Sequence, residues 1–451
     1  MRKTWKAFLT GVTIAFLGFK TTGVAGQTAL SLKKAIELSL VNSNSLKSDS
    51  LNIIVANYQV KVLKSDFLPQ VNYAARSEYN PAIPSQMLPG SIAGHPEKDL
   101  VPVKFGTNYG LSSGMEITQN LMKKSMRYQI DEAGINQNIA QTKYSMSRED
   151  LVYQVAISYY TLQTDAELIR TTNKDYHNLL DIVRVAKAQF ENGTIKKIDL
   201  SSLQINADNK ESYLRQLQTQ YKNHLIQFNW LLGVSADSKT IIEDSISTSD
   251  RIIEPGNQYQ QRQDIHLSNL MIGSKEMEMR SIRAEKLPMI STYVKYNYAS
   301  QFNHSKNAWN NEYWFNSSTI GISTSIPIFD GNRRRSRISI AQTELQQLRF
   351  QHELRQQSAD KEWVSANETL GNYRDQLQIT KRNLGLAERV FETRKALYAE
   401  GVTTLVELLD AEKDLSQSRD LYTQALINVQ SGIVNVYKAK GTLLTEFLNT
   451  L

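Results

Sequence analysis

The sequence predicts an α+β membrane protein in which long α-helical coiled-coil hairpins are combined with a small number of β-strands. Two stretches without proline, 103–254 and 328–451, carry apolar residues at three- and four-residue spacing and favour long helices. Two pairs of shorter segments alternate apolar and polar residues, as strands with one buried face do. The same order of segments occurs twice, which predicts an internal tandem repeat.

The N-terminus has the features of an export signal, which we expect to cover residues 1–26. A basic start between Arg2 and Lys6 precedes an apolar core at 7–19, and small residues follow. An N-terminal anchor is the alternative interpretation of this segment. No later run reaches about 18 apolar residues, so we expect any insertion into a membrane to use strands.

The composition narrows the class of protein. Mean hydropathy is −0.42, which argues against a helical membrane protein. The formal charge of +7 is spread along the chain rather than gathered in a basic tract, so we expect no nucleic-acid partner. Cysteine is absent, which excludes disulfides and cysteine nucleophiles. The histidines form no metal-spaced pair and no phosphate-loop or nucleophile-elbow motif is present, so we predict no enzyme, cofactor or metal site.

Each half is predicted to contain one very long helix, then a turn, then a helix about half as long. At about 1.5 Å per residue, each long helix would span on the order of 100 Å. A lone helix of that length cannot bury its apolar stripe, so the helices must pack side by side. Shorter helical segments have the length to complete a second column. The expected helices cover residues 29–66, 122–190, 197–232, 260–286, 333–398 and 405–440.

Matching residues define the two repeats. Gly193 matches Gly401 in the two predicted turns, and Pro69 matches Pro288 before the first strand of each half. The matches drift in spacing mainly because of a proline-rich loop around 80–103 in the first half. The expected division is a signal peptide at 1–26, a first repeat at 27–233, a linker at 234–259 and a second repeat at 260–451.

Four segments of alternating residues are the expected strands. They lie at about 70–80, 106–118, 289–299 and 318–329. Strands of this length cross a bilayer when they are tilted. Tyr298 and Trp314, near strand ends, are residue types that suit a membrane interface. A small soluble sheet packed on the helices is the alternative that this pattern leaves open.

The number of strands predicts an oligomer. Four strands cannot close a barrel that satisfies every backbone group in lipid, so copies of the chain must share one. Two copies would give eight strands and an interior filled by side chains, whereas three would give twelve strands around a passage. The polar strand faces suit a wet lumen. We therefore expect a trimer, although strand arithmetic leaves a dimer open.

Basic pairs recur just after the second strand of each half. Lys123 and Lys124 match Arg334 and Arg335. Positive charge at a helix start opposes the helix dipole, so the pairs need another benefit. Contact with lipid phosphates is our hypothesis, and a merely solvated helix start is the alternative.

Four segments stand in a diagnostic order: LPQVNYAARSEY, LPMISTYVKYNY, IPIFDGNRR and YAEGVTTLVELLDAEKDL. Their order and duplication resemble the TolC-like outer-membrane efflux protein family. The resemblance implies a homotrimer in the cell outer membrane, whose shared 12-stranded β-barrel continues into an α-barrel in the periplasm. It also implies a periplasmic adaptor protein and an inner-membrane pump as partners.

The resemblance further implies functional residues just past the second turn. Glu407 and Asp410 match the acidic pair that lines the narrow tunnel entrance of the family. Copies of both around a small opening would favour cations and resist anions. A capping box between Thr404 and Glu407 explains the first acid equally well, whereas Asp410 lies one turn deeper.

Other matches concern links that hold the entrance shut and the tips that dock the adaptor. Tyr398 and Asp199 match two link residues. Thr403 falls where some members have arginine, and Lys196 or Lys197 in the other turn is the candidate substitute. The expected docking tips are Gly193, Thr194, Gly401 and Val402. The alternative role of the glycines is simply to close a helical hairpin.

These expectations lead to one preferred function and two alternatives. The preferred function is the exit duct of a tripartite efflux system that exports small molecules across the outer membrane. A duct for secreted proteins differs from it only in cargo. A non-conducting, structural coiled-coil protein of the cell envelope belongs to a different class and predicts no ion conductance.

Overall fold

The computed structural model describes residues 29–243 and 262–449. The expected signal peptide and most of the expected linker lie outside these residues. The first repeat contains α1 (Leu32–Asn42), α2 (Asn44–Ser65), β1 (Gln70–Tyr79), β2 (Ser85–Pro89), β3 (Leu100–Lys104), β4 (Tyr109–Met122), α3 (Lys124–Glu191) and α4 (Lys197–Leu232). The second contains α5 (Gln263–Ala284), β5 (Met289–Phe302), β6 (Trp314–Ser325), α6 (Arg333–Ala399), α7 (Leu405–Lys440) and α8 (Leu443–Asn449).

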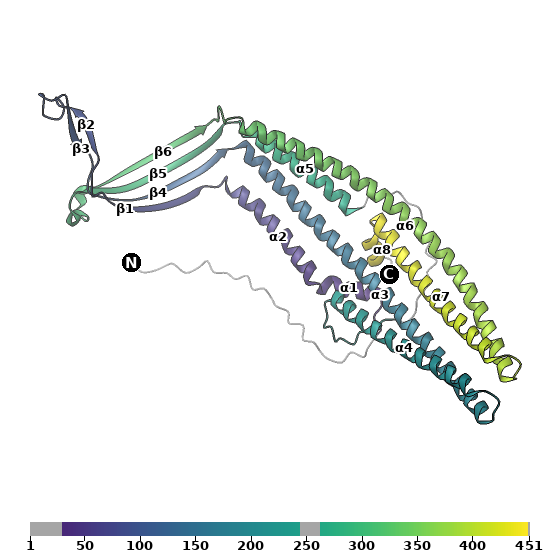
Figure 1. The fold of residues 1–451 in the computed structure, drawn as a ribbon. Helices are drawn as coiled ribbons and strands as arrows, with labels where there is room; N and C mark the ends of the chain where they lie inside the picture. Colours follow the sequence, from purple (N-terminus) through teal and green to yellow (C-terminus); the bar gives the residue numbers. More distant parts are fainter. Residues whose placement is uncertain (1–28, 244–261, 450–451) are drawn as a thin grey trace, which may run out of the picture.

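The molecule is elongated, with a sheet at one end and the turns of two long helical hairpins at the other (Figure 1). The longest helices, α3 and α6, have 68 and 67 residues. At about 1.5 Å per residue, each reaches roughly 100 Å. Helix α3 packs against α4 and α6 against α7, while α2 and α5 flank the halves of α3 and α6 nearer the sheet. Each long helix therefore lies beside shorter helices stacked end to end.

One helix differs from its expected bounds. The single helix expected at 29–66 is broken at Ser43 into α1 and α2. Ser43 has a non-helical backbone, with φ −54° and ψ 116°, and its side chain accepts a hydrogen bond from the N–H of Leu46. Serine and asparagine compete with the helix for backbone hydrogen bonds, so the NSNS run at this point favours a cap over a continuous helix.

Two apolar clusters hold the helices together. One lies where α1, α8 and the ends of α4 and α7 meet the middle of α3, and it includes Val152, Phe228 and Val434. The other lies nearer the turns and includes Leu203, Phe391 and Leu408. All six of these side chains are at most 1% exposed. Within the described residues, no helix is both long and apolar enough to cross a membrane.

The main sheet has the order β1-β4-β5-β6, and every pairing in it is antiparallel. Strands β1 and β4 form one hairpin, β5 and β6 form the second, and β4 joins β5 in the middle. Strands β1 and β6 are therefore the two edges. One face of the sheet carries Val294 and Ile320, whereas the other carries Glu116 and Lys295, which form an ion pair of 2.9 Å.

The strand bounds also differ from those expected. The last strand was expected at 318–329 but runs from Trp314 to Ser325. The following residues, Ile326 to Phe329, have strand-like alternation but no neighbouring strand to pair with. The strand expected at 106–118 is displaced to Tyr109–Met122. The loop expected around 80–103 contains β2 and β3, a separate hairpin at the end of the sheet remote from the helices (Figure 1).

Candidate functional site

Both helical hairpins reverse at the same end of the molecule (Figure 1). Gly193 and Gly401 have φ values of 72° and 74°, a left-handed conformation that residues with a Cβ rarely adopt. In each turn the N–H of the residue after the glycine donates to the carbonyl oxygen five residues earlier. Thr194 N–H donates to Gln189 O and Val402 N–H to Leu397 O, both at 2.9 Å. The two turns are therefore copies of one helix-ending motif. The exposed tips are Thr194 and Val402.

Glu407 makes the capping contacts that the sequence allowed. The Thr404 hydroxyl accepts from the N–H of Glu407, and the Glu407 carboxylate accepts from the N–H of Thr404, each at 3.3 Å. The Thr403 hydroxyl donates to the same carboxylate. These hydrogen bonds, that of Thr403 above all, hold the pKa of Glu407 below its ordinary value, so the group stays ionised at neutral pH. Half of the side chain is nevertheless exposed.

The cation beside Glu407 comes from a residue that the sequence analysis missed. Arg394, on the last turns of α6, places Nη1 3.3 Å from Glu407 Oε2 and 3.2 Å from Thr403 Oγ1. Neither Lys196 nor Lys197 forms an ion pair within the part of the chain that the structure describes. Arg394 lies about as far before the turn as Glu407 lies after it. This pairing across the turn is the signal that could have identified it.

Tyr398 and Asp199 do not bond to each other in the single chain. Tyr398 is 8% exposed, and its hydroxyl donates to Gln189 Oε1 at 2.9 Å, which ties the end of α6 to the end of α3. Burial, and secondly the nearby charge of Asp199, raise the pKa of Tyr398. The Asp199 carboxylate instead accepts from the N–H of Lys196 at 3.3 Å. Asp199 thus caps α4 as Glu407 caps α7.

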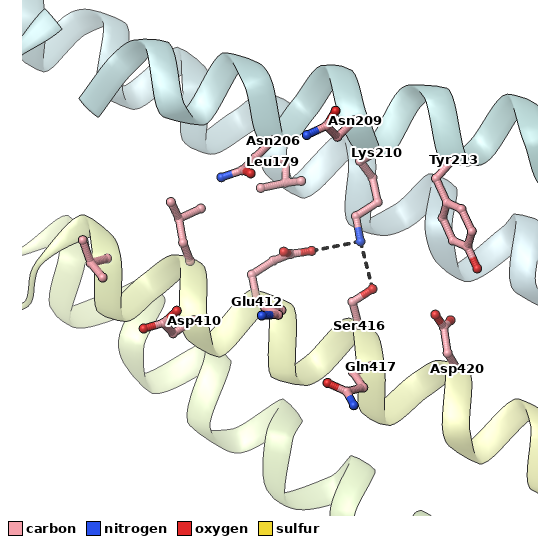
Figure 2. Close-up of a pocket in the computed structure, with 13 residues that line it drawn as sticks. Leu179, Asn206, Asn209, Lys210, Tyr213, Asp410, Glu412, Ser416, Gln417 and Asp420 are labelled. Carbon is pink, nitrogen blue, oxygen red and sulfur yellow. Dashed lines mark hydrogen bonds and ion pairs between the residues drawn. The ribbon is translucent and has the colours of Figure 1, made fainter. Parts of the chain in front are cut away.

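Asp410 lies exposed on α7, at the edge of a groove between the two hairpins. The groove has a volume of about 630 Å³ and lies mainly between α4 and α7 (Figure 2). Lys210 of α4 crosses it, with Nζ 2.8 Å from Ser416 Oγ and 3.5 Å from Glu412 Oε1 on α7. Asp420 also lines the groove. The hairpins are therefore joined by charged contacts as well as by their apolar cluster.

A second buried ion pair lies close to the groove. Asp175 of α3 is 4% exposed and pairs with Arg419 of α7, which is also 3.7 Å from Glu388 of α6. Burial raises the pKa of Asp175, Glu412 and Asp420, and Lys210 opposes the rise in all three. Sequence reasoning missed these contacts. The signal that could have indicated them is a charged residue at a helical position that faces the core.

The residues expected at membrane interfaces lie at opposite ends of the sheet. Tyr298 and Trp314 stack with ring centroids 4.7 Å apart, at the end remote from the helices. Lys123 and Lys124 lie where β4 meets α3. In the second repeat, Arg334 forms an ion pair with Asp330, with Nη1 3.7 Å from Oδ2, whereas Arg335 is exposed.

A family model for outer membrane efflux proteins matches residues 35–234 and 257–442, which together form most of both repeats. The chain belongs to the outer membrane efflux protein family. Cation efflux system protein CusC of Escherichia coli is 23% identical over 443 residues, covering 94% of this chain and 88% of CusC. Toluene efflux pump outer membrane protein TtgC of Pseudomonas putida is 21% identical over 418 residues, covering 91% and 83%.

Solved structures of such proteins share the fold. A crystal structure of CusC superimposes with a TM-score of 0.76 at 20% identity, and the match covers 91% of this chain and 92% of that one. The comparisons confirm the expected family and the α+β fold with long helical hairpins. As an outer membrane efflux protein, the chain resides in the outer membrane, and its helices form a large periplasmic extension. The family consists of efflux proteins rather than enzymes.

Proposed function

We propose that three copies of the chain form the outer-membrane exit duct of a tripartite efflux system. The supporting observation is the sheet, which has four strands and two unpaired edges at one end of the molecule, while the reversals of the two long helical hairpins lie at the other. Unpaired backbone groups cannot face lipid, so the edges β1 and β6 need partners from other copies. Three copies give a closed barrel of twelve strands.

The two faces of the sheet suit such a barrel. On one face Ile320 and Ile322 are 79% and 71% exposed in the single chain, which is costly unless lipid covers them. The opposite face carries the Glu116–Lys295 pair and Asn297, which suit water. The barrel is therefore oriented with Ile320 toward lipid and Lys295 toward the lumen.

We further propose that Glu407 and Asp410 form the acidic ring of the periplasmic entrance. Both are exposed and lie within the first two turns of α7. Arg394 offsets part of the charge of Glu407, so Asp410 is the acid of the pair with no ion-pair partner in the described residues. Carboxylates from three copies around a narrow opening would concentrate cations there.

The partners follow from the position of the turns. Gly193, Thr194, Gly401 and Val402 form the end farthest from the membrane, and Val402 is 70% exposed. We propose that a periplasmic adaptor docks on these tips and couples the duct to an inner-membrane pump, which supplies the energy. At the opposite end of the helices, Lys123, Lys124 and Arg335 are proposed to contact lipid phosphates.

The proposed cargo is a small molecule. The names of the relatives mention cations and toluene, which differ in charge and polarity. Because related ducts belong to systems with such different cargos, we infer that selection rests largely with the partners. Export of a protein is the alternative cargo, and a non-conducting envelope protein is the alternative function.

Planar-bilayer recording of the purified protein tests the proposal. We expect single-channel conductance that hexaamminecobalt(III) blocks from the periplasmic side, and loss of the block in the double variant Glu407→Gln, Asp410→Asn. Glu97→Gln, which removes one carboxylate charge in the β2–β3 connection, should keep the block. Absence of conductance would favour the structural alternative, whereas a block that survives the double change would reject the acidic ring.

A further inference from the structure

The two hairpins of the sheet are equivalent copies of one unit. Each begins directly after a Leu-Pro dipeptide, β1 with Gln70 and β5 with Met289. Within its hairpin Gln70 pairs with Thr118, and Met289 pairs with Ser325. Thr118 and Ser325 are therefore equivalent positions on β4 and β6. This equivalence relates every paired residue of the β1–β4 hairpin to a residue of the β5–β6 hairpin.

The β4–β5 pairing shows how one unit joins the next. Strand β4 is the second strand of its unit and β5 is the first strand of the following unit. Their register places Ile117 opposite Val294 and Glu116 opposite Lys295. In a ring of copies, β6 has the same relation to β1 of the neighbouring copy, since β6 is also a second strand and β1 a first.

We propose that the seam between copies repeats the register of β4 with β5. This inference rests on the proposed trimer and adds the pairing of individual residues. Ile117 is equivalent to Thr324 and Val294 to Ala75, so Thr324 lies opposite Ala75 of the neighbouring copy. Both residues belong to the face that carries Ile320. A slip by one residue would turn one strand's apolar face toward the lumen.

The lumenal side of the seam differs from its intrachain counterpart in charge. The equivalents of Glu116 and Lys295 are Ser323 and Arg76, so Ser323 lies opposite Arg76 of the neighbouring copy. Arg76 already has a carboxylate in its own strand, Glu78, at 3.2 Å. Arg76 thus keeps the positive charge of Lys295. The acid that pairs with it, Glu78, lies on the same strand rather than on the facing one.

The register also gives a partner to the exposed segment after β6. Ile326 falls opposite Tyr73 of the neighbouring copy, and the two side chains are 55% and 69% exposed in the single chain. Pro327 falls at the equivalent of Asn120, where the β4–β5 ladder shifts before Met122. Sheets tolerate proline at such irregularities, so Pro327 does not oppose the pairing.

Cysteine crosslinking tests the register, because the natural chain has no cysteine. Two double variants are compared, Thr324→Cys with Ala75→Cys and Ser323→Cys with Arg76→Cys. Facing pairs alternate between wider and closer spacing along an antiparallel ladder, so testing consecutive pairs includes a close one. After mild oxidation of outer membranes, non-reducing gels should show covalent dimers and trimers that dithiothreitol returns to monomers.

Two control variants separate the register from the trimer. Thr324→Cys with Val71→Cys uses the same face but lies four residues out of register, about 13 Å away, and should crosslink at least about fivefold less. Ile117→Cys with Val294→Cys tests the equivalent pair inside one chain. Faster crosslinking to Val71 than to Ala75 would overturn the register and leave the trimer standing. If only the intrachain pair crosslinks, both the register and the trimer are overturned.

Discussion

Arg394 and Glu407 join the two arms of the second hairpin across its turn, with Arg394 Nη1 3.3 Å from Glu407 Oε2. Arg394 also reaches Thr403 in the turn itself. The side chains are 41% and 47% exposed, so solvent screens the pair and it contributes little to stability. Its main effect is on local charge, because it places a cation beside one of the two acids of the proposed entrance.

Replacing Arg394 should therefore strengthen block by multivalent cations. In Arg394→Gln the Glu407 carboxylate loses its cation but keeps the hydrogen bonds that lower its pKa, so it stays ionised at neutral pH. We expect the blocking concentration of hexaamminecobalt(III) to fall by about two- to fivefold at low ionic strength, where screening is weak. Arg389→Gln, an exposed change earlier in α6 and farther from the turn, is the control. If both variants are blocked at the same concentration, Arg394 does not affect the charge of the entrance.

The cap of α7 should be measurable separately from its charge. Thr404→Ala removes the hydroxyl that accepts from the N–H of Glu407, and we expect it to destabilise the helix by about 1 kcal/mol. Thermal unfolding in detergent, followed by circular dichroism, measures the change. Thr393→Ala, inside α6 near its C-terminal end, is the control, since its hydroxyl only bonds back to Arg389 O and the change should be near neutral. An equal loss in both variants would contradict a specific cap.

Lys210 should stabilise the contact between the two hairpins in a pH-dependent way. Burial raises the pKa of Asp175, Glu412 and Asp420, so protonation of these acids favours the folded state, and their contribution to stability falls as pH rises through the raised pKa values. Lys210 opposes this loss. Lys210→Met should therefore cost about 3 kcal/mol near pH 8, and less near pH 5.

Thermal unfolding at the two pH values measures the effect of Lys210. Lys222→Met, an exposed change on the same helix, should cost little at either pH. The double variant Lys210→Met, Glu412→Leu should recover part of the loss, because it removes one of the uncompensated acids. A cost for Lys210→Met that is the same at pH 5 and pH 8 would show that packing, rather than charge, explains it.

Two glycines of the second hairpin should respond to alanine in opposite directions. Gly371 lies inside α6 with nothing within 4 Å of an added Cβ, so Gly371→Ala should stabilise the helix by about 0.5–1 kcal/mol. Gly401 is equally open but has a φ of 74°, so Gly401→Ala should destabilise it by about 1 kcal/mol. Equal signs in unfolding experiments would contradict the assignment of the Gly401 turn.

Most of the architecture could be predicted from sequence because its signals are local. Periodicity marked the long helices, and the paired glycines marked both reversals. The break at Ser43 and the end of β6 were missed, since one depends on competition between cap and helix and the other on the lack of a neighbouring strand. Arg394 and Lys210 were missed because their partners are set by packing across helices, which spacing along one helix does not reveal.

The β2–β3 hairpin interrupts the first repeat and has no counterpart of its kind in the second, where β5 and β6 are joined by short helical turns. It projects from the end of the sheet that is remote from the helices (Figure 1). A ring of three copies would thus expose three such fingers, rather than six, to antibodies and bacteriophages. Sequence changes in this hairpin could then alter recognition of the bacterium from outside without altering the lumen through which cargo passes.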